Sequence, residues 1–341
     1  MNKQSEKRYT DISILRIIAT LGVIFLHTNN TLTANKDLFS LSMQEFKFYT
    51  ALWSLMQWAV PVFMMITGTL MLNRSKEYDW KNIVFNYSRR VVLALFIFGV
   101  PFSCLEMIMN KGNINLMILF KGVLNVLNGK SWGHLWYLYT LIGFYLVLPI
   151  MKLFVEHIDK DNYTYILILM FVFKYVIPII DMIGLDLYFS IPIMADIVFY
   201  TLLGAYIYKY NCFNTIKKYY LFVVVLICAT VKILESYRMN WNGEISGLFT
   251  PIMAIAILAL IKETKFKGNS EKLWNIDRLC FCVYLVHPVF TNGFYKALKI
   301  HPALWETNVF IVLLFWVGFS ASSFFIAFVL YKIKPLKKYV L

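Results

Sequence analysis

The sequence predicts an all-α, polytopic membrane protein with about ten transmembrane helices, and three observations lead to this fold class. Of the 341 residues, 60% are hydrophobic and 15% are charged, whereas a soluble domain averages about 45–50% apolar and about 25% charged residues. The mean hydropathy is +0.63 and aromatic residues reach 18%. The apolar residues also fall into separate runs that are long enough to cross a bilayer. These features exclude a soluble enzyme and a disordered chain.

Each predicted span is an apolar run of roughly the 20 residues that a helix needs to cross the hydrocarbon core. In chain order, the runs are 12–31, 50–72, 88–109, 134–154, 163–183, 192–210, 218–238, 246–262, 278–297 and 307–332. The apolar stretch 113–128 is shorter and contains Lys121 and Asn125, so we expect an interfacial or re-entrant helix there. Residues 1–341 are expected to form a single membrane domain.

The charged residues give the orientation of these spans. The chain carries 33 lysines and arginines against 19 acidic residues, for a formal net charge of +14. No nucleic-acid-binding signature accompanies this charge, so we expect no nucleic-acid partner. With both termini in the cytoplasm, most basic residues fall in cytoplasmic loops, as the positive-inside rule requires. If 113–128 crossed the membrane, the loops after it would change sides and this bias would be lost.

The cysteines and the other metal-ligand residue types predict no metal site. The five cysteines lie in or near apolar runs, and the spacing of Cys280 and Cys282 does not match the usual zinc patterns. We interpret them as buried apolar residues. No HEXXH motif and no dense His/Asp/Cys cluster is present.

Two ionisable residues lie inside the first span. Arg16 and His27 are eleven positions apart, which is three helical turns plus about 20°, so both project from one face at about 16 Å separation along the axis. Ionisable residues inside a span mark functional sites by default. Alternatively, Arg16 is an anchor that reaches the cytoplasmic interface and His27 bonds to a backbone carbonyl.

Two further histidines accompany aromatic residues. His134, Trp136 and Tyr137 open the fourth span on its outer side, where an aromatic belt is the alternative explanation. His287 lies about 13 Å into the ninth span, directly before Pro288, which can kink the helix. The alternative for His287 is a histidine that bonds to a neighbouring helix.

The loop after the second span concentrates positive charge. It follows Thr67 and contains Arg74, Lys81, Arg89 and Arg90. These side chains suit a phosphate-bearing ligand, because guanidinium groups bind phosphate bidentately. They also satisfy the positive-inside rule without any ligand.

Several short motifs in a fixed order resemble the integral-membrane acyltransferase-3 family over most of the chain. The motifs are Arg16 and His27 with ten residues between them, Pro61-Val62-Phe63 with Ile66-Thr67-Gly68, Arg89-Arg90, His134-Leu135-Trp136-Tyr137 with Tyr145 and Pro149, and Tyr284-Leu285-Val286-His287-Pro288. Thr67 stands where the family often has Ser, and the hydroxyl is kept. We expect a stand-alone membrane domain, without the extracytoplasmic hydrolase-like domain that some members carry.

The resemblance implies an O-acyltransferase, most often an O-acetyltransferase, in a bacterial cytoplasmic membrane. The donor would be cytoplasmic acetyl-CoA or another acyl-CoA, and the acceptor a hydroxyl of a cell-surface or lipid-linked glycan. A hydroxyl needs a base whose pKa lies near the working pH, so His27 is the expected base. Arg16 would meet the thioester or the pyrophosphate of the donor.

The remaining candidate residues are assigned to the donor phosphates and to the acceptor. Arg89 and Arg90, with Arg74 or Lys81, would hold the nucleotide phosphates. The acceptor-side candidates are His134, Trp136, Tyr137, His287 and Thr67. Two alternatives stay open: a transporter or flippase of lipid-linked sugars, which would show paired broken helices in two halves, and a structural or sensory membrane protein.

Overall fold

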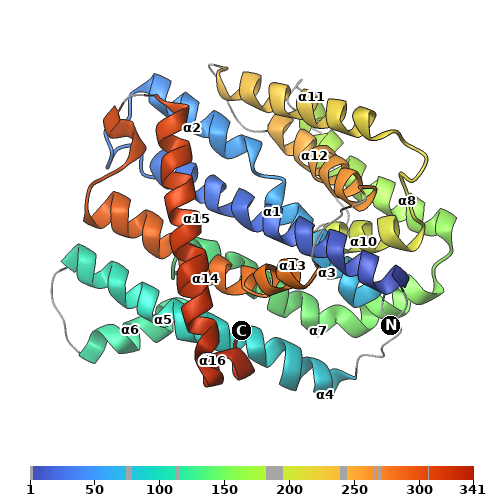
Figure 1. Ribbon diagram of the computed structural model, residues 1–341, viewed down its shortest axis with the longest axis horizontal. Coiled ribbons are helices and arrows are strands. Elements are labelled where there is room, and N and C mark those ends of the chain that lie inside the picture. The colour runs from blue at the N-terminus through green and yellow to red at the C-terminus, as the bar shows by residue number, and fades with distance from the viewer. Residues whose placement is uncertain are drawn as a thin grey trace. The chain divides into compact units, whose positions relative to one another are not determined.

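The computed structural model describes residues 3–73, 79–111, 116–181, 195–238, 244–264, 266, 270–305 and 307–341. Within these ranges every regular element is a helix, which confirms the all-α fold class (Figure 1). The chain divides into two compact units, each built from three stretches. They are Met1–Ser75, Lys152–Arg278 and Pro302–Val317 for the first unit, and Lys76–Met151, Leu279–His301 and Gly318–Leu341 for the second. The single domain expected from the sequence stays a prediction.

The first unit holds the longest uninterrupted helix, α1. Its elements are α1 (Lys3–Thr33), α2 (Met43–Leu55), α3 (Ala59–Leu72), α8 (Lys160–Phe171), the π-helix η3 (Val172–Val176), α9 (Ile177–Asp181), α10 (Asp196–Lys209), α11 (Lys218–Ser236), α12 (Glu244–Lys262), α13 (Ser270–Asp277) and the 3-10 helix η5 (Pro302–Trp305).

The second unit is built around α5 and the helices that pack on it. Its elements are α4 (Trp80–Asn82), the π-helix η1 (Ile83–Ser88), α5 (Arg89–Lys111), α6 (Leu116–Leu127), the 3-10 helix η2 (Gly133–Leu135), α14 (Cys280–Asn292), the π-helix η4 (Gly293–Ala297) and α16 (Lys334–Tyr339). Two helices pass from one unit to the other along the chain, namely α7 (Trp136–His157) and α15 (Val309–Lys332).

Eight helical segments of the described residues are long and apolar enough to cross a membrane. They are Thr10–Thr33, Met43–Leu72, Trp80–Met109, Gly133–His157, Lys160–Ile180, Lys218–Ser236, Ile245–Lys262 and Val309–Lys332. Large apolar side chains on them face outward; Phe310, for example, is 75% exposed. A surface of this kind is stable only in a lipid solvent, so the chain is a multi-pass membrane protein.

The other two predicted spans correspond to shorter helices. The run 192–210 contains α10, which has 14 residues, and its first residues lie outside the described ranges. The run 278–297 contains α14, which has 13 residues and continues into η4. The count of ten spans and the cytoplasmic placement of both termini therefore stay predictions.

The stretch 113–128 forms the short helix α6 from Leu116 onward, and α6 packs beside α5 (Figure 1). Its 12 residues span about 18 Å, which is well short of the about 30 Å of a hydrocarbon core. The side-chain amide of Asn125 donates to Ser103 Oγ on α5 at 2.9 Å. The polar residue inside this apolar stretch thus bonds within the unit, and the interfacial or re-entrant placement of the helix stays a prediction.

Helix α1 is the core of the first unit, because it contacts α2, α3, α12 and α13. Leu15, Ala19 and Val23 on it are almost fully buried. Trp316 Nε1 donates to the carbonyl of Leu21 at 2.9 Å. A central helix is the element whose side chains are held most firmly, so α1 can position functional groups.

Two glycines allow α3 and α10 to cross with their backbones in contact. A Cβ added to Gly68 would lie 1.9 Å from the carbonyl oxygen of Thr201, and one added to Gly204 would lie 2.2 Å from that of Met65. Small residues permit such close approach of helices in a membrane, where dispersion between packed atoms replaces the hydrophobic effect.

Lys232 is a fully buried lysine in the C-terminal third of α11. Its Nζ donates to Gln57 Oε1 at 2.8 Å, to the carbonyl of Ser246 at 2.9 Å and to Thr250 Oγ1 at 2.8 Å. An ammonium group has three donors, and all three are used. Lys232 thus ties α11 to α12, which lies alongside it, and to the break between α2 and α3 (Figure 1).

Candidate functional site

Arg16, near the middle of α1, forms a part-buried ion pair. Its Nη1 lies 2.6 Å from Asp277 Oδ1, at the end of α13, and the other carboxylate oxygen accepts from Ser13 Oγ at 2.9 Å. The Asp277 side chain is 7% exposed and that of Arg16 is 27% exposed. The carboxylate therefore holds the guanidinium in one orientation, with part of it still accessible.

A second buried carboxylate lies one turn before Arg16. Asp11 Oδ2 accepts from the hydroxyl of Tyr208 on α10 at 3.1 Å, and Asp11 Oδ1 accepts from the amide of Ile12 at 3.0 Å. The first turns of the membrane part of α1 thus carry Asp11, Ser13 and Arg16, and Asp277 on α13 joins the last two of these in a polar cluster. A charged cluster inside a membrane protein is expensive and usually functional.

His27 lies on the same helix, half-buried, and its carbonyl accepts from Thr31 Oγ1 at 2.8 Å. Helix α1 is continuous from Lys3 to Thr33. The helical spacing that places Arg16 and His27 on one face therefore applies to both residues. Along a regular helix the two lie about 16 Å apart. Thr67, on α3, is half-buried, and its hydroxyl donates to the carbonyl of Phe63 at 2.9 Å.

The predicted phosphate-binding residues lie at the start of the second unit. Lys81, Arg89 and Arg90 are exposed, and Lys81 Nζ lies 5.7 Å from the centroid of Trp80. Arg90 Nε donates to the carbonyl of Val340 at 3.0 Å. Arg74 lies outside the described residues. The structure therefore leaves Arg89 and Lys81 oriented towards the surroundings and ties Arg90 to the C-terminal segment.

His134 and His287 come together in the second unit. Their ring centroids are 5.6 Å apart at an interplanar angle of 72°, and the side chains are 4% and 0% exposed. The hydroxyl of Tyr284 donates to the carbonyl of His134, and its ring lies edge-on to the ring of His134. The two histidines are separated by 153 positions in the sequence. They form a buried pair, and Tyr284 contacts it.

Pro288 explains how His287 is oriented. Proline has no amide hydrogen, so it leaves the carbonyl four residues earlier, that of Tyr284, without its helical donor. His287 Nδ1 lies 2.8 Å from this carbonyl and 3.2 Å from that of Val283. A carbonyl only accepts, so Nδ1 carries the proton and Nε2 is the basic nitrogen of the neutral ring. Pro288 lies inside α14, and the histidine before it closes the gap that it creates.

The aromatic candidates divide between the surface and this histidine pair. Trp136 is 50% exposed, as an aromatic belt residue would be, whereas the ring of Tyr137 lies edge-on to Tyr284 at 6.0 Å. Trp132 stacks on Phe102 at 4.3 Å. Its indole donates to Glu106 Oε2 at 3.0 Å, and Glu106 Oε1 pairs with Lys296 at 3.2 Å.

A protein-family model described as an acyltransferase domain matches residues 9–332 of the chain. The chain belongs to the acyltransferase-3 family. This membrane protein is therefore an acyltransferase, and the match includes both units. No match was found among curated proteins or among solved structures.

Sequence reasoning did not select two carboxylates of the acyltransferase. Asp277 is 261 positions from Arg16, and Glu106 is 26 positions from Trp132 and 190 from Lys296, both of which it contacts. Their positions in the sequence could have identified them. Glu106 lies within an apolar run and Asp277 directly beside one, and the chain has only 19 acidic residues. Among the described residues, no group of three or more His, Cys, Asp or Glu side chains could hold a metal ion.

Proposed function

We propose that this acyltransferase moves an acetyl group from cytoplasmic acetyl-CoA to a hydroxyl of a cell-surface or lipid-linked glycan in a bacterial cytoplasmic membrane. The observation that carries the proposal is the ion pair of Arg16 with Asp277, which also accepts from Ser13, on the helix that bears His27. Membership of an acyltransferase family favours transfer over the transport alternative.

His27 is the proposed general base. The acceptor oxygen attacks the thioester carbonyl, the carbon–sulfur bond breaks, and coenzyme A leaves as its thiol or thiolate. His27 takes the hydroxyl proton, a role in which a positioned base contributes about 10²–10⁴-fold. The half-buried setting of His27 on the central helix supports this role.

Arg16 is proposed to act on the donor. The bond to Asp277 anchors one nitrogen of the guanidinium, and the remaining donors of the fork are proposed to stabilise charge that develops on the thioester oxygen or remains on the pyrophosphate. Arg89 and Lys81, with Arg90 and Arg74, are proposed to hold the nucleotide phosphates. The exposure of Arg89 and Lys81 supports this assignment.

The acceptor is proposed to approach the histidine pair of the second unit. His287 presents Nε2 as its basic nitrogen, and His134, Tyr137 and Tyr284 supply rings of the kind on which sugars pack. Trp136 and Thr67 are proposed as further acceptor contacts.

The test uses purified protein in vesicles with labelled acetyl-CoA and glycan from cells that lack the gene. Mass spectrometry of the product should show the addition of one acetyl group, and His27→Ala should lower the rate at least about a hundredfold at equal folded concentration. Addition of a succinyl group would correct the acyl donor. A mutant rate above about a tenth of wild type would make His27 a structural residue.

A second control separates a base from a hydrogen-bond donor. His27→Gln keeps a hydrogen-bonding side chain but cannot accept a proton near neutral pH, so it should not restore the rate. Recovery of the wild-type rate in His27→Gln would contradict general-base catalysis by this residue.

A further inference from the structure

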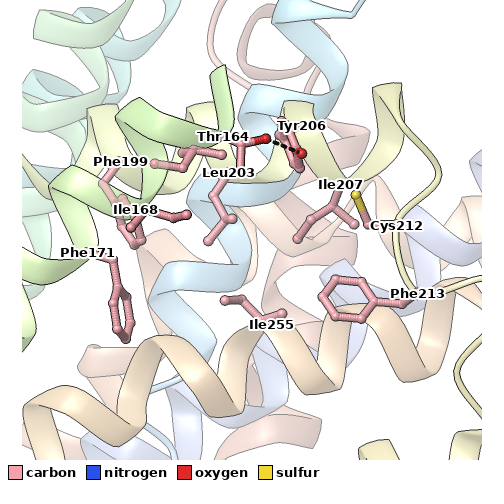
Figure 2. A pocket seen from close by; sticks show the side chains of 11 residues that line it. Thr164, Ile168, Phe171, Phe199, Leu203, Tyr206, Ile207, Cys212, Phe213 and Ile255 are labelled. Carbon is pink, nitrogen blue, oxygen red and sulfur yellow. Dashed lines mark hydrogen bonds between the residues drawn. The ribbon is translucent and has the colours of Figure 1, made fainter. Parts of the chain in front are cut away.

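An apolar pocket of about 260 Å³ lies in the first unit among α8, α10 and α12 (Figure 2). Its lining residues include Thr164, Ile168, Tyr206, Cys212, Phe213 and Ile255. The two hydroxyls among them, those of Thr164 and Tyr206, bond to each other at 2.6 Å. Because a buried polar group without a partner is costly, the pocket suits a hydrocarbon chain and not the amide-containing arm of coenzyme A.

Each of the three helices carries a lysine beyond the same end of the pocket. Lys160 lies one turn before Thr164 on α8, and the Thr164 hydroxyl donates to its carbonyl. Lys209 lies one turn after Tyr206 on α10. Lys262, on α12, comes seven positions after Ile255, which is two turns along one face.

Contacts with one short segment, residues 210–213, show that the three lysines gather there. The ammonium groups of Lys160 and Lys209 lie 5.6 and 5.4 Å from the centroid of Tyr210. Lys262 Nζ donates to Asn211 Oδ1 at 2.5 Å. Lys262 also pairs with Glu263, which compensates its charge. Lys209 Nζ donates to the uncharged carbonyl of Val155 at 2.6 Å, so its charge and that of Lys160 are the ones offered to a ligand.

The same segment closes the end of the pocket. Cys212 and Phe213 line it, and Asn211 and Phe213 have φ values of 51° and 73°. A positive φ is strained for a bulky residue such as Phe and persists only where the surroundings impose it. Burial raises the pKa of the Cys212 thiol, while the nearby Lys160 and Lys262 act to lower it. The positive charge therefore lies next to the apolar wall.

We propose that this pocket binds one acyl chain of an anionic phospholipid of the cytoplasmic leaflet, with the lipid phosphate at Lys160 and Lys209. An apolar pocket with positive charge at one end complements an amphiphile with an anionic head. The positive-inside rule assigns the loops that carry these lysines to the cytoplasm, and the cytoplasmic leaflet holds the anionic lipids that attract basic residues. The site shares no residue with the proposed acyl-transfer machinery, so the two proposals can fail separately.

The test is native mass spectrometry of the detergent-purified protein with phosphatidylglycerol, and with phosphatidylcholine of the same acyl chains. One phosphatidylglycerol should remain bound per chain, in clear preference to phosphatidylcholine. Lys160→Gln with Lys209→Gln should weaken phosphatidylglycerol binding by about fivefold for each lysine and leave phosphatidylcholine unchanged. Lys217→Gln with Lys218→Gln is the matched charge control, because it removes the same charge from the other end of the loop that follows Lys209.

Filling the pocket tests the acyl chain. Ile168 is 57% exposed and lines the pocket, so Ile168→Trp fits the fold while its indole occupies the space of the chain. It should reduce bound phosphatidylglycerol severalfold. Tyr165→Trp, on the same helix at 62% exposure and outside the lining, is the matched control and should bind as the wild type does.

Three outcomes would overturn the proposal. They are equal retention of the two lipids, unchanged binding in Ile168→Trp, and displacement of the lipid by an equal concentration of palmitoyl-CoA. The third outcome would assign the pocket to a long-chain acyl donor.

Discussion

At the scale of single residues, the most informative group is the carboxylate of Asp277. It is 7% exposed and holds Arg16 at 2.6 Å. An isolated charge of this burial would be neutralised or expelled, so each partner is retained in the membrane part of the protein by the other. The pair is therefore both a structural link between α13 and α1 and a means of aiming the guanidinium.

Asp277→Asn keeps the shape of this side chain and removes its charge. We expect a lower temperature of unfolding in detergent and loss of acyl transfer. Removing one partner of a buried pair costs about 3–5 kcal/mol, and less here because 27% of the Arg16 side chain stays exposed. The double variant Asp277→Asn with Arg16→Met should regain stability without regaining activity. Wild-type activity in Asp277→Asn would mean that the ion pair does not position Arg16.

The roles of the two ring nitrogens of His287 can be tested separately. In His287→Asn the amide nitrogen can replace Nδ1 as the donor to the carbonyl of Tyr284, but no group replaces Nε2. We expect near-wild-type thermal stability and at least a tenfold lower rate of acetylation. His287→Ala should lose both. If His287→Asn were fully active, the residue would serve only to satisfy the carbonyl that Pro288 leaves open.

Sequence reasoning reached the residues of one helix more easily than residues from different helices. The spacing of Arg16 and His27 depends only on helical geometry, and α1 is continuous as that argument requires. Asp277 could not be assigned, because the packing of α13 on α1 is set by tertiary contacts over 261 positions. The pairing of His134 with His287 was equally out of reach from local spacing.

At the scale of helices, length and apolar composition predicted most helical segments. Where a helix breaks or ends early, packing against other helices is the cause. The run 50–72 lies in two helices, α2 and α3, with a break at residues 56–58 whose Gln57 accepts from Lys232. The run 192–210 reads as a span because α10 is apolar on all sides. The structure shows a 14-residue helix with ten buried residues. Many of its apolar side chains therefore contact other helices and not lipid.

The crossing of α3 and α10 gives a prediction at this scale. Gly68→Ala and Gly204→Ala should each destabilise the protein by more than the about 1–3 kcal/mol of ordinary overpacking, because the added carbon meets a backbone atom that cannot rotate away. The midpoint of thermal unfolding measures this. Gly247→Ala, in the same unit with open space around it, should change the midpoint little. An unchanged midpoint in Gly68→Ala would mean that the two helices can separate without cost.

At the scale of the whole molecule, orientation in the membrane is the main prediction from charge. A single cysteine at Asn35 should react with an impermeant thiol reagent on intact cells, and one at Lys217 should react only after the membrane is opened. The reason is the concentration of basic residues in the loops assigned to the cytoplasm. The five native cysteines require a cysteine-free background as the reference. Labelling of position 217 alone in intact cells would reverse the orientation.

The three bonds of Lys232 also bear on how the chain enters the membrane during synthesis. Its acceptors lie on α12 and at Gln57, and Glu235 on the same helix accepts from the amides of Ile245 and Ser246 at the start of α12. Insertion of a lone helix costs about 2.5–3.5 kcal/mol for a lysine at its centre and less for one nearer its end, as Lys232 is. We therefore expect α11 and α12 to leave the translocon together as a hairpin. A fusion protein that carries α11 as its only apolar segment should remain extractable by alkaline carbonate, and one that carries α11 together with α12 should not.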